Sequence, residues 1–223
     1  MRRILSINII DVVPFSKGLL FVRKETLANG SVKVSFFSFD ITSGKIAPVT
    51  KSVYLLNKFG AAYAPIAEHL GDYVSCDTCR LPGGQTFVIY TTGEAGIFDD
   101  KGMVLWTGDI IYQEAPARDA AADGRFVWCV VPQKNAIIKY SPSGKKVVMR
   151  IGGDRTTSFS LPGSIAIYDN LLYVCNRGSN KIRTIRLSDY AVEDYRLFEE
   201  PVHKYIRVMD REFVILDSGV YML

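Results

Sequence analysis

The chain has 223 residues, of which 48% are hydrophobic and 22% are charged, and its formal net charge is +4. This composition is close to ordinary globular usage and allows a core of good size. The mild positive charge permits an anionic partner without requiring one, and no stretch approaches the ~18 uninterrupted apolar residues of a spanning helix, which excludes a helical membrane protein.

The first expected element is a strand over residues 3–10. Two arginines before an apolar run are also typical of a signal peptide. However, Asn8 and Asp11 interrupt the run, and no small-residue cleavage site follows. The strand is the better interpretation, and we expect a soluble, cytoplasmic protein.

From residue 11 onward the sequence repeats a unit of four short strands. Residues 126–144 and 171–189 match best: each has an apolar run, a small polar loop ending in Asn, and an alternating segment that closes on a turn. Asp169-Asn170 is a hairpin-type turn within one copy. The strands expected in successive copies are 11–15, 19–22, 32–39 and 46–49; 73–79, 87–90, 97–98 and 103–106; 119–122, 126–131, 136–140 and 146–151; 164–168, 171–175, 182–187 and 192–198; and 205–209, 213–216 and 220–223.

Units of about 40 to 45 residues have the size of β-propeller blades. The last copy lacks a fourth strand, and strand 3–10 has no unit of its own, so we expect the two to pair and close a ring. The predicted fold is all-β, a single five-bladed propeller over residues 1–223. Its parts are blade 1 at about 11–52, an insertion at 53–70, blade 2 at about 71–110, blade 3 at about 111–153, blade 4 at about 154–199, and blade 5 at about 200–223 plus 2–10. A sandwich or barrel is the alternative, but it gives no reason for a self-similar unit.

Residues 53–70 break the repeat. Ala62, Ile66, Ala67 and Leu70 are spaced as one face of a short helix, whose start Pro65 limits. The segment covers one end of the channel, presents a docking surface, or is a plain inserted loop.

The four cysteines are expected to be reduced and partly buried. Cys76 and Cys79 form a C-x-x-C, but Cys129 and Cys175 are single and lie within apolar strands. A zinc site usually needs a second close pair, so structural metal and a redox pair are the less favoured interpretations.

Two stretches resemble the NHL repeat. That repeat has a Gly-Gly ending, an apolar-Pro-x-Gly-Ile-Ala-Val strand, a Val-Tyr-Val strand and then Asn-x-(Arg/Lys)-Ile. The matching residues here are Ile151-Gly-Gly, Phe159, Leu161-Pro-Gly-Ser-Ile-Ala-Ile, Leu172-Tyr-Val and Asn180-Lys-Ile. The resemblance covers copies three and four well, and copies two and five in part. It implies a propeller without fixing one activity. Related propeller enzymes, the lactonases and lyases, hold a metal in the central channel with acidic, Asn or His ligands.

We expect one loop-lined face to bind a partner, because the loops after the second and fourth strands of every blade share that face. The candidate residues there are Arg118, Asp119, Lys134, Arg177, Asn180, His203, Lys204 and Asp217. A rim of Lys and Arg can focus a field on an acidic partner, although solvated loop charge explains it as well.

The expected function is a non-enzymatic interaction module for a protein or peptide, including an acidic one. The first alternative is a lactonase- or lyase-like enzyme with Ca or Zn in the channel. The second is single-stranded RNA binding, with Tyr63, Tyr112 and Tyr205 as candidate stacking platforms.

No catalytic residue, metal ligand, cofactor or membrane partner is expected. The chain has only two histidines, His69 and His203, and Asp99-Asp100 reads as part of a turn. No acidic residue is identified in an inner-strand context.

Overall fold

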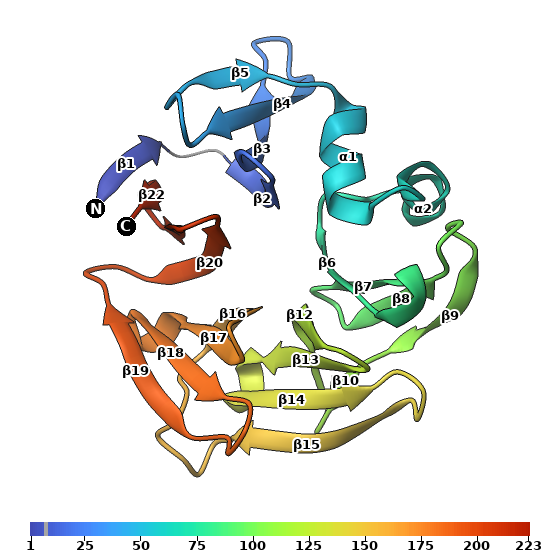
Figure 1. The fold of residues 1–223 in the computed structure, drawn as a ribbon, viewed down its shortest axis with the longest axis vertical. Helices are drawn as coiled ribbons and strands as arrows, with labels where there is room; N and C mark the ends of the chain where they lie inside the picture. The colour runs from blue at the N-terminus through green and yellow to red at the C-terminus, as the bar shows by residue number, and fades with distance from the viewer. Residues whose placement is uncertain (7–8) are drawn as a thin grey trace.

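The computed structural model describes residues 1–6 and 9–223, so residues 7 and 8 of the predicted strand 3–10 lie outside the described part. Five four-stranded antiparallel sheets stand in a ring around a central axis (Figure 1). The prediction of a five-bladed β-propeller is confirmed. None of the described helices is long and apolar enough to cross a membrane.

Each blade is a meander that runs from an inner to an outer strand. The blades are, in order, β2 (Ile9–Phe15), β3 (Gly18–Thr26), β4 (Val32–Asp40) and β5 (Ile46–Pro48); β6 (Cys76–Arg80), β7 (Thr86–Tyr90), β8 (Glu94–Phe98) and β9 (Val104–Asp109); β12 (Arg118–Asp123), β13 (Phe126–Val131), β14 (Ala136–Ser141) and β15 (Lys146–Gly152); β16 (Pro162–Tyr168), β17 (Leu171–Asn176), β18 (Lys181–Arg186) and β19 (Val192–Leu197); and β20 (Val202–Val208), β21 (Arg211–Leu216), β22 (Gly219–Met222) and β1 (Arg2–Leu5). A short hairpin, β10 (Ile111–Tyr112) and β11 (Ala115–Pro116), lies between blades 2 and 3.

The two ends of the chain close the ring, as predicted. β1 pairs antiparallel with β22, so that Arg2 lies opposite Met222 and Arg3 opposite Tyr221. The two termini therefore lie side by side (Figure 1). This pairing removes the unpaired edge that β22 would otherwise present.

Turn chemistry explains the repeated unit. Asp169 and Asn170 both have positive φ, as the tight hairpin between β16 and β17 requires. The polar loops of blades 3 and 4 each form one turn of 3-10 helix, η2 (Pro132–Lys134) and η3 (Arg177–Ser179). Each ends on Asn in the left-handed conformation, Asn135 and Asn180, which Asn tolerates better than most residues.

The hydrophobic core lies between neighbouring blades. Blade 3 contributes Trp128 and Val130 to one cluster, and blade 4 contributes Ile165 and Val174. Similar clusters join the other pairs of blades, and they include the last and first blades in sequence. Each blade is therefore covered on both faces by its neighbours.

The border between blades 1 and 2 differs because two helices fill it. α1 (Lys51–Phe59) and α2 (Tyr63–Leu70) lie between these sheets (Figure 1). Tyr54, Phe59 and Ile66 are fully buried there, and burial of such a side chain contributes about 1.5–3 kcal/mol. They pack in one cluster with Val22 of blade 1 and Val88 of blade 2.

The sequence predicts α2 but not α1. The insertion is not a plain loop: its two helices form a wedge between blades 1 and 2, which is not among the alternatives predicted for this segment. Thr50 caps α1, because its hydroxyl accepts from the backbone N–H of Val53 at 3.3 Å, and Gly60 at φ +78° ends it.

Candidate functional site

Topology gives the propeller one distinctive face. All five inner strands, β2, β6, β12, β16 and β20, begin there, because every blade is a four-stranded meander with its inner strand first. The loops between second and third strands, including η2 and η3, reach the same face. We call it the mouth face.

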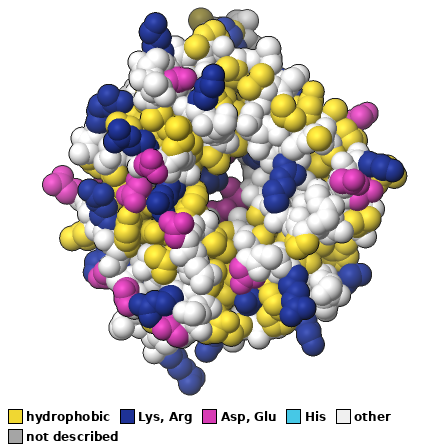
Figure 2. All heavy atoms as spheres, viewed as in Figure 1, with side chains coloured by type: hydrophobic (Ala, Val, Ile, Leu, Met, Phe, Trp, Pro, Cys, Tyr) yellow, Lys and Arg dark blue, Asp and Glu magenta, His cyan; other side chains and the backbone are white. Residues whose placement is uncertain are grey.

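A cavity of about 410 Å³ lies in the central channel, and the inner strands and α1 line it. Figure 2 shows the hollow at the centre of the molecule, with acidic side chains inside it. Its charged groups are Asp11, Lys58, Asp77, Asp119 and Lys204, with Arg80 farther along β6. Its aliphatic lining includes Val13, Ile165, Ile167 and Ile206.

Asp11, on β2, is held by α1. The ammonium group of Lys58 lies 2.6 Å from Asp11 Oδ2, and the hydroxyl of Tyr54 donates to the same oxygen at 2.5 Å. The Lys58 ammonium also donates to the backbone carbonyl of Val74 at 3.1 Å. The side chains of Lys58 and Asp11 are only 3% and 9% exposed. The pair therefore neutralises two buried charges and joins blade 1 to the helical wedge.

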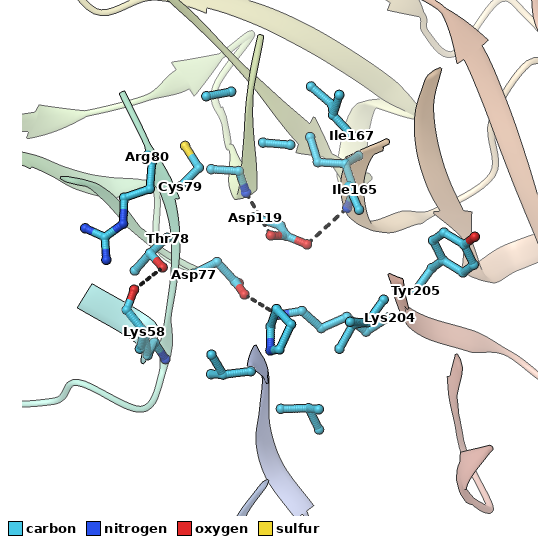
Figure 3. Close-up of a pocket in the computed structure, with 18 of the residues that line it drawn as sticks. Lys58, Asp77, Thr78, Cys79, Arg80, Asp119, Ile165, Ile167, Lys204 and Tyr205 are labelled. Atoms are coloured by element: carbon cyan, nitrogen blue, oxygen red, sulfur yellow. Dashed lines mark hydrogen bonds and ion pairs between the residues drawn. The ribbon is translucent and has the colours of Figure 1, made fainter. Parts of the chain in front are cut away.

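A second ion pair crosses the channel from blade 2 to blade 5. Lys204 Nζ on β20 lies 2.8 Å from Asp77 Oδ1 on β6, and both side chains are 28% exposed (Figure 3). Burial favours the neutral form of Lys204, but Asp77, Asp119 and Asp11 outweigh it and raise the pKa of this ammonium. Burial likewise opposes the charge of Asp77, but Lys204 outweighs it and lowers the pKa of that carboxyl. Both groups therefore stay charged at neutral pH.

The third carboxylate, Asp119, has no such counter-charge in contact. It stands at a bulge of β12 with φ +49°, and it is 5% exposed. Its oxygens accept from the backbone N–H groups of Ala120 at 2.8 Å and Ile165 at 3.0 Å, the latter on blade 4 (Figure 3). Burial first, and the charge of Asp77 second, raise the pKa of Asp119 to about 7.

The thiols around the channel are poor nucleophiles. Burial raises the pKa of Cys76 and of Cys175 to about 12, and it also raises the pKa of Cys79 and Cys129. Successive side chains of a strand point to opposite sides, so residues three apart diverge. Cys76 accordingly packs toward the helical wedge and Cys79 toward blade 3.

The eight predicted site residues separate into two groups. Asp119 and Lys204 line the cavity. The others lie around it: Arg118 and His203 near the starts of β12 and β20, Lys134 in η2, Arg177 and Asn180 in and after η3, and Asp217 between β21 and β22. His203 Nε2 contacts Asp217 Oδ1, so these two side chains face each other.

The prediction that no acidic residue stands in an inner-strand context is wrong. Asp11, Asp77 and Asp119 all lie on inner strands, one on each of the first three blades. The signal was present in the sequence as an Asp among apolar residues, Ile9-Ile-Asp-Val-Val13, in the first inner strand. Within residues 1–6 and 9–223, however, no group of three or more His, Cys, Asp or Glu side chains is arranged to hold a metal ion.

Comparison with solved structures gives the fold alone, since every identity is low. The chain is similar to hydrazine synthase of Kuenenia stuttgartiensis (TM-score 0.53, 15% identity), over 66% of this chain but only 45% of that one. It is similar over 98% of its length to a streptogramin B lyase, covering 69% of that chain (TM-score 0.51, 12% identity). It is also similar to a catalytically inactive virginiamycin B lyase from Staphylococcus aureus with quinupristin (TM-score 0.51, 12% identity). That match covers 98% of this chain and 86% of the lyase chain. No protein-family model and no curated protein matches the chain.

Proposed function

We propose that this protein is a non-enzymatic, NHL-like propeller that binds a protein or a small ligand through its mouth face. One observation carries the proposal: a channel cavity of about 410 Å³ has charged groups near the starts of the inner strands and aliphatic walls beyond them. Binding sites are typically concave and mostly apolar, with a few convergent polar groups. A small molecule, or one side chain of a partner, matches these dimensions.

The protonation states in the channel favour binding over covalent catalysis. A lysine nucleophile must lose its proton, whereas the carboxylates around Lys204 raise its pKa. A cysteine nucleophile must be a thiolate, whereas burial raises the pKa of Cys76 to about 12. Neither group is prepared to attack a substrate at neutral pH.

Support for binding of an acidic partner or RNA at the rim is weaker than support for binding of a ligand in the channel. Two of the basic candidates already face carboxylates, since Lys204 pairs with Asp77 and His203 contacts Asp217. Of the three tyrosines considered as RNA-stacking platforms, Tyr205 is only 2% exposed. Tyr63 and Tyr112 are partly buried against hydrophobic clusters.

A thermal-shift screen tests the proposal. The panel contains small amines, carboxylates, sugars, nucleotides and short peptides. It is run on the wild type, on Ala166→Phe, which adds bulk at the channel wall, and on Val148→Phe, which adds bulk on the exposed outer strand β15. We expect at least one compound to raise the melting temperature of the wild type and of Val148→Phe but not of Ala166→Phe. A panel that stabilises none of them, or all three equally, would refute channel binding.

A second candidate is an enzyme that uses acid–base chemistry, and it rests on Asp119 alone. A carboxyl whose pKa is about 7 can both take and give a proton at neutral pH. Mass spectrometry of each stabilising compound after long incubation tests this. Conversion by the wild type and not by Asp119→Asn supports an enzyme, and recovery of unchanged compound supports the binding module.

A further inference from the structure

The channel contains more negative than positive side chains. Three carboxylates, Asp11, Asp77 and Asp119, face two ammonium groups, Lys58 and Lys204. The guanidinium of Arg80, which also borders the cavity, points away from it and donates to Thr86 (Figure 3). A narrow, low-dielectric cleft with an excess of one charge attracts ligands of the opposite charge.

The excess lies at Asp119. Asp11 is matched by Lys58 in a closed pair, and Asp77 by Lys204. Within residues 1–6 and 9–223, the side-chain hydrogen bonds that the Asp119 carboxylate accepts come only from backbone N–H groups. These bonds stabilise a negative charge without supplying a positive one.

The surroundings of Asp119 suit an organic cation with a hydrocarbon chain. Ile165 and Ile167 border the cavity beside it (Figure 3), and Val13 and Ile206, which pack mainly between blades, also border it. A bare metal ion fits less well, because the described residues contain no group of three or more His, Cys, Asp or Glu side chains arranged to hold one.

We propose that the mouth of the channel binds an alkylammonium group, with Asp119 accepting its hydrogen bonds and the aliphatic walls holding its carbon chain. The inference rests on the proposed function, since it names the ligand class of the same site. Two sources present this chemistry: a free small amine, and the lysine side chain of a partner.

Binding of a cation requires the ionised form of Asp119. The titratable groups that face Asp119 are Asp77, Cys79, Cys129, Tyr168, Cys175 and Lys204. The four thiol and phenol groups have raised pKa values, and both members of the Asp77–Lys204 pair stay charged, so Asp119 is the group that titrates near neutrality. With a pKa of about 7, its ionised fraction, and hence the affinity, rises about tenfold from pH 6 to pH 8.

Isothermal titration calorimetry with matched six-carbon probes tests the inference on the wild-type chain. These probes are n-hexylamine, hexan-1-ol and hexanoate, and CaCl₂ is added as a metal-ion probe. A capped tripeptide with a central lysine is compared with its acetyl-lysine form to separate a peptide source from a free amine. We expect hexylamine to bind, hexanol and hexanoate to bind at least about tenfold more weakly, and CaCl₂ not to bind.

Two variants locate the site. Asp119→Asn should weaken hexylamine binding at least about tenfold, and Asp210→Asn, in an exposed turn between β20 and β21, should leave it unchanged. Because Asp119 also accepts two backbone hydrogen bonds, its variant can fail to fold. The wild type then decides: titration at pH 7 in two buffers of different ionisation enthalpy should show release of about half a proton per amine bound.

The outcomes separate the inference from the proposed function. If hexanoate or CaCl₂ binds in place of hexylamine, and Ala166→Phe weakens that binding, the proposed ligand class is wrong. The proposed function as a binding module then still stands. The inference is also overturned if the affinity for hexylamine changes neither with pH nor in Asp119→Asn and Ala166→Phe, because the amine then binds elsewhere. If none of these probes binds and no compound of the thermal-shift panel stabilises the protein, both the inference and the proposed function are overturned.

Discussion

Replacement of Lys58 by methionine should be among the most damaging single changes on the channel wall. The variant keeps most of the packing volume but leaves the Asp11 carboxylate, 9% exposed, without its cation at 2.6 Å. Removal of one partner of a buried pair costs about 3–5 kcal/mol, because the remaining charge is uncompensated. For a domain of this size that corresponds to a fall in melting temperature of roughly 6–20 °C.

Urea unfolding followed by circular dichroism measures the effect, and a double-mutant cycle isolates it. Lys58→Met combined with Asp11→Asn should be more stable than Lys58→Met alone, with a coupling energy of about 2–3 kcal/mol. The control is Arg23→Met in the exposed Arg23–Glu25 pair, 48% and 35% exposed, which should cost about 0–1 kcal/mol. A loss no greater than that of the control would refute the view that this ion pair fastens the helical wedge.

Three further predictions concern ring closure, pH and thiol reactivity. A Cβ on Gly219, at φ +145°, would lie 2.2 Å from the carbonyl oxygen of Leu5, so Gly219→Ala should cost at least about 3 kcal/mol in urea unfolding. Gly124→Ala, which meets no atom within 4 Å, should cost about 1–2 kcal/mol, and equal losses would contradict the steric account. The folded-state pKa of Asp119, about 7, lies above the usual 3.8, so the folded state binds more protons between these values. The contribution of this group to the free energy of unfolding should therefore fall as pH rises through that window, and Asp119→Asn should remove the fall; a pH-independent difference between the two proteins would count against it. Finally, the three fully buried thiols should resist a thiol reagent in the native protein at pH 8 and all four should react in urea, whereas rapid native labelling of more than one would contradict their burial.

The propeller could be predicted because its signals are local. The Asp169-Asn170 turn marks the hairpin of β16 and β17, and alternation marks β18 as the next strand, without knowledge of the rest of the chain. The pairing of β1 with β22 followed from counting strands rather than from any contact pattern. α1 was predictable as well, since Thr50 and Gly60 stand at its ends as helix-capping residues, but its Val-Tyr-Leu-Leu run did not attract a helical interpretation.

The site was harder to predict because its residues meet across the ring. Lys58 and Asp11 are distant in sequence, and Lys204 and Asp77 more so, so no spacing rule brings either pair together. A bulge also shifts the register between Val202 and Lys204. Because one residue of shift changes the side to which a strand residue points, the sequence could not show that Lys204 faces the channel instead of the rim.

The helical wedge also gives the channel a direction around its axis. A ring of five equal sheets would offer a ligand the same wall five times, and the ligand could then settle in five equivalent rotations. Here α1 lines the channel in addition to the five inner strands, and it presents Asn57 and Lys58 on one side of the wall. This departure from fivefold symmetry makes the five rotations unequal, so that a molecule in the channel can be held in a single orientation.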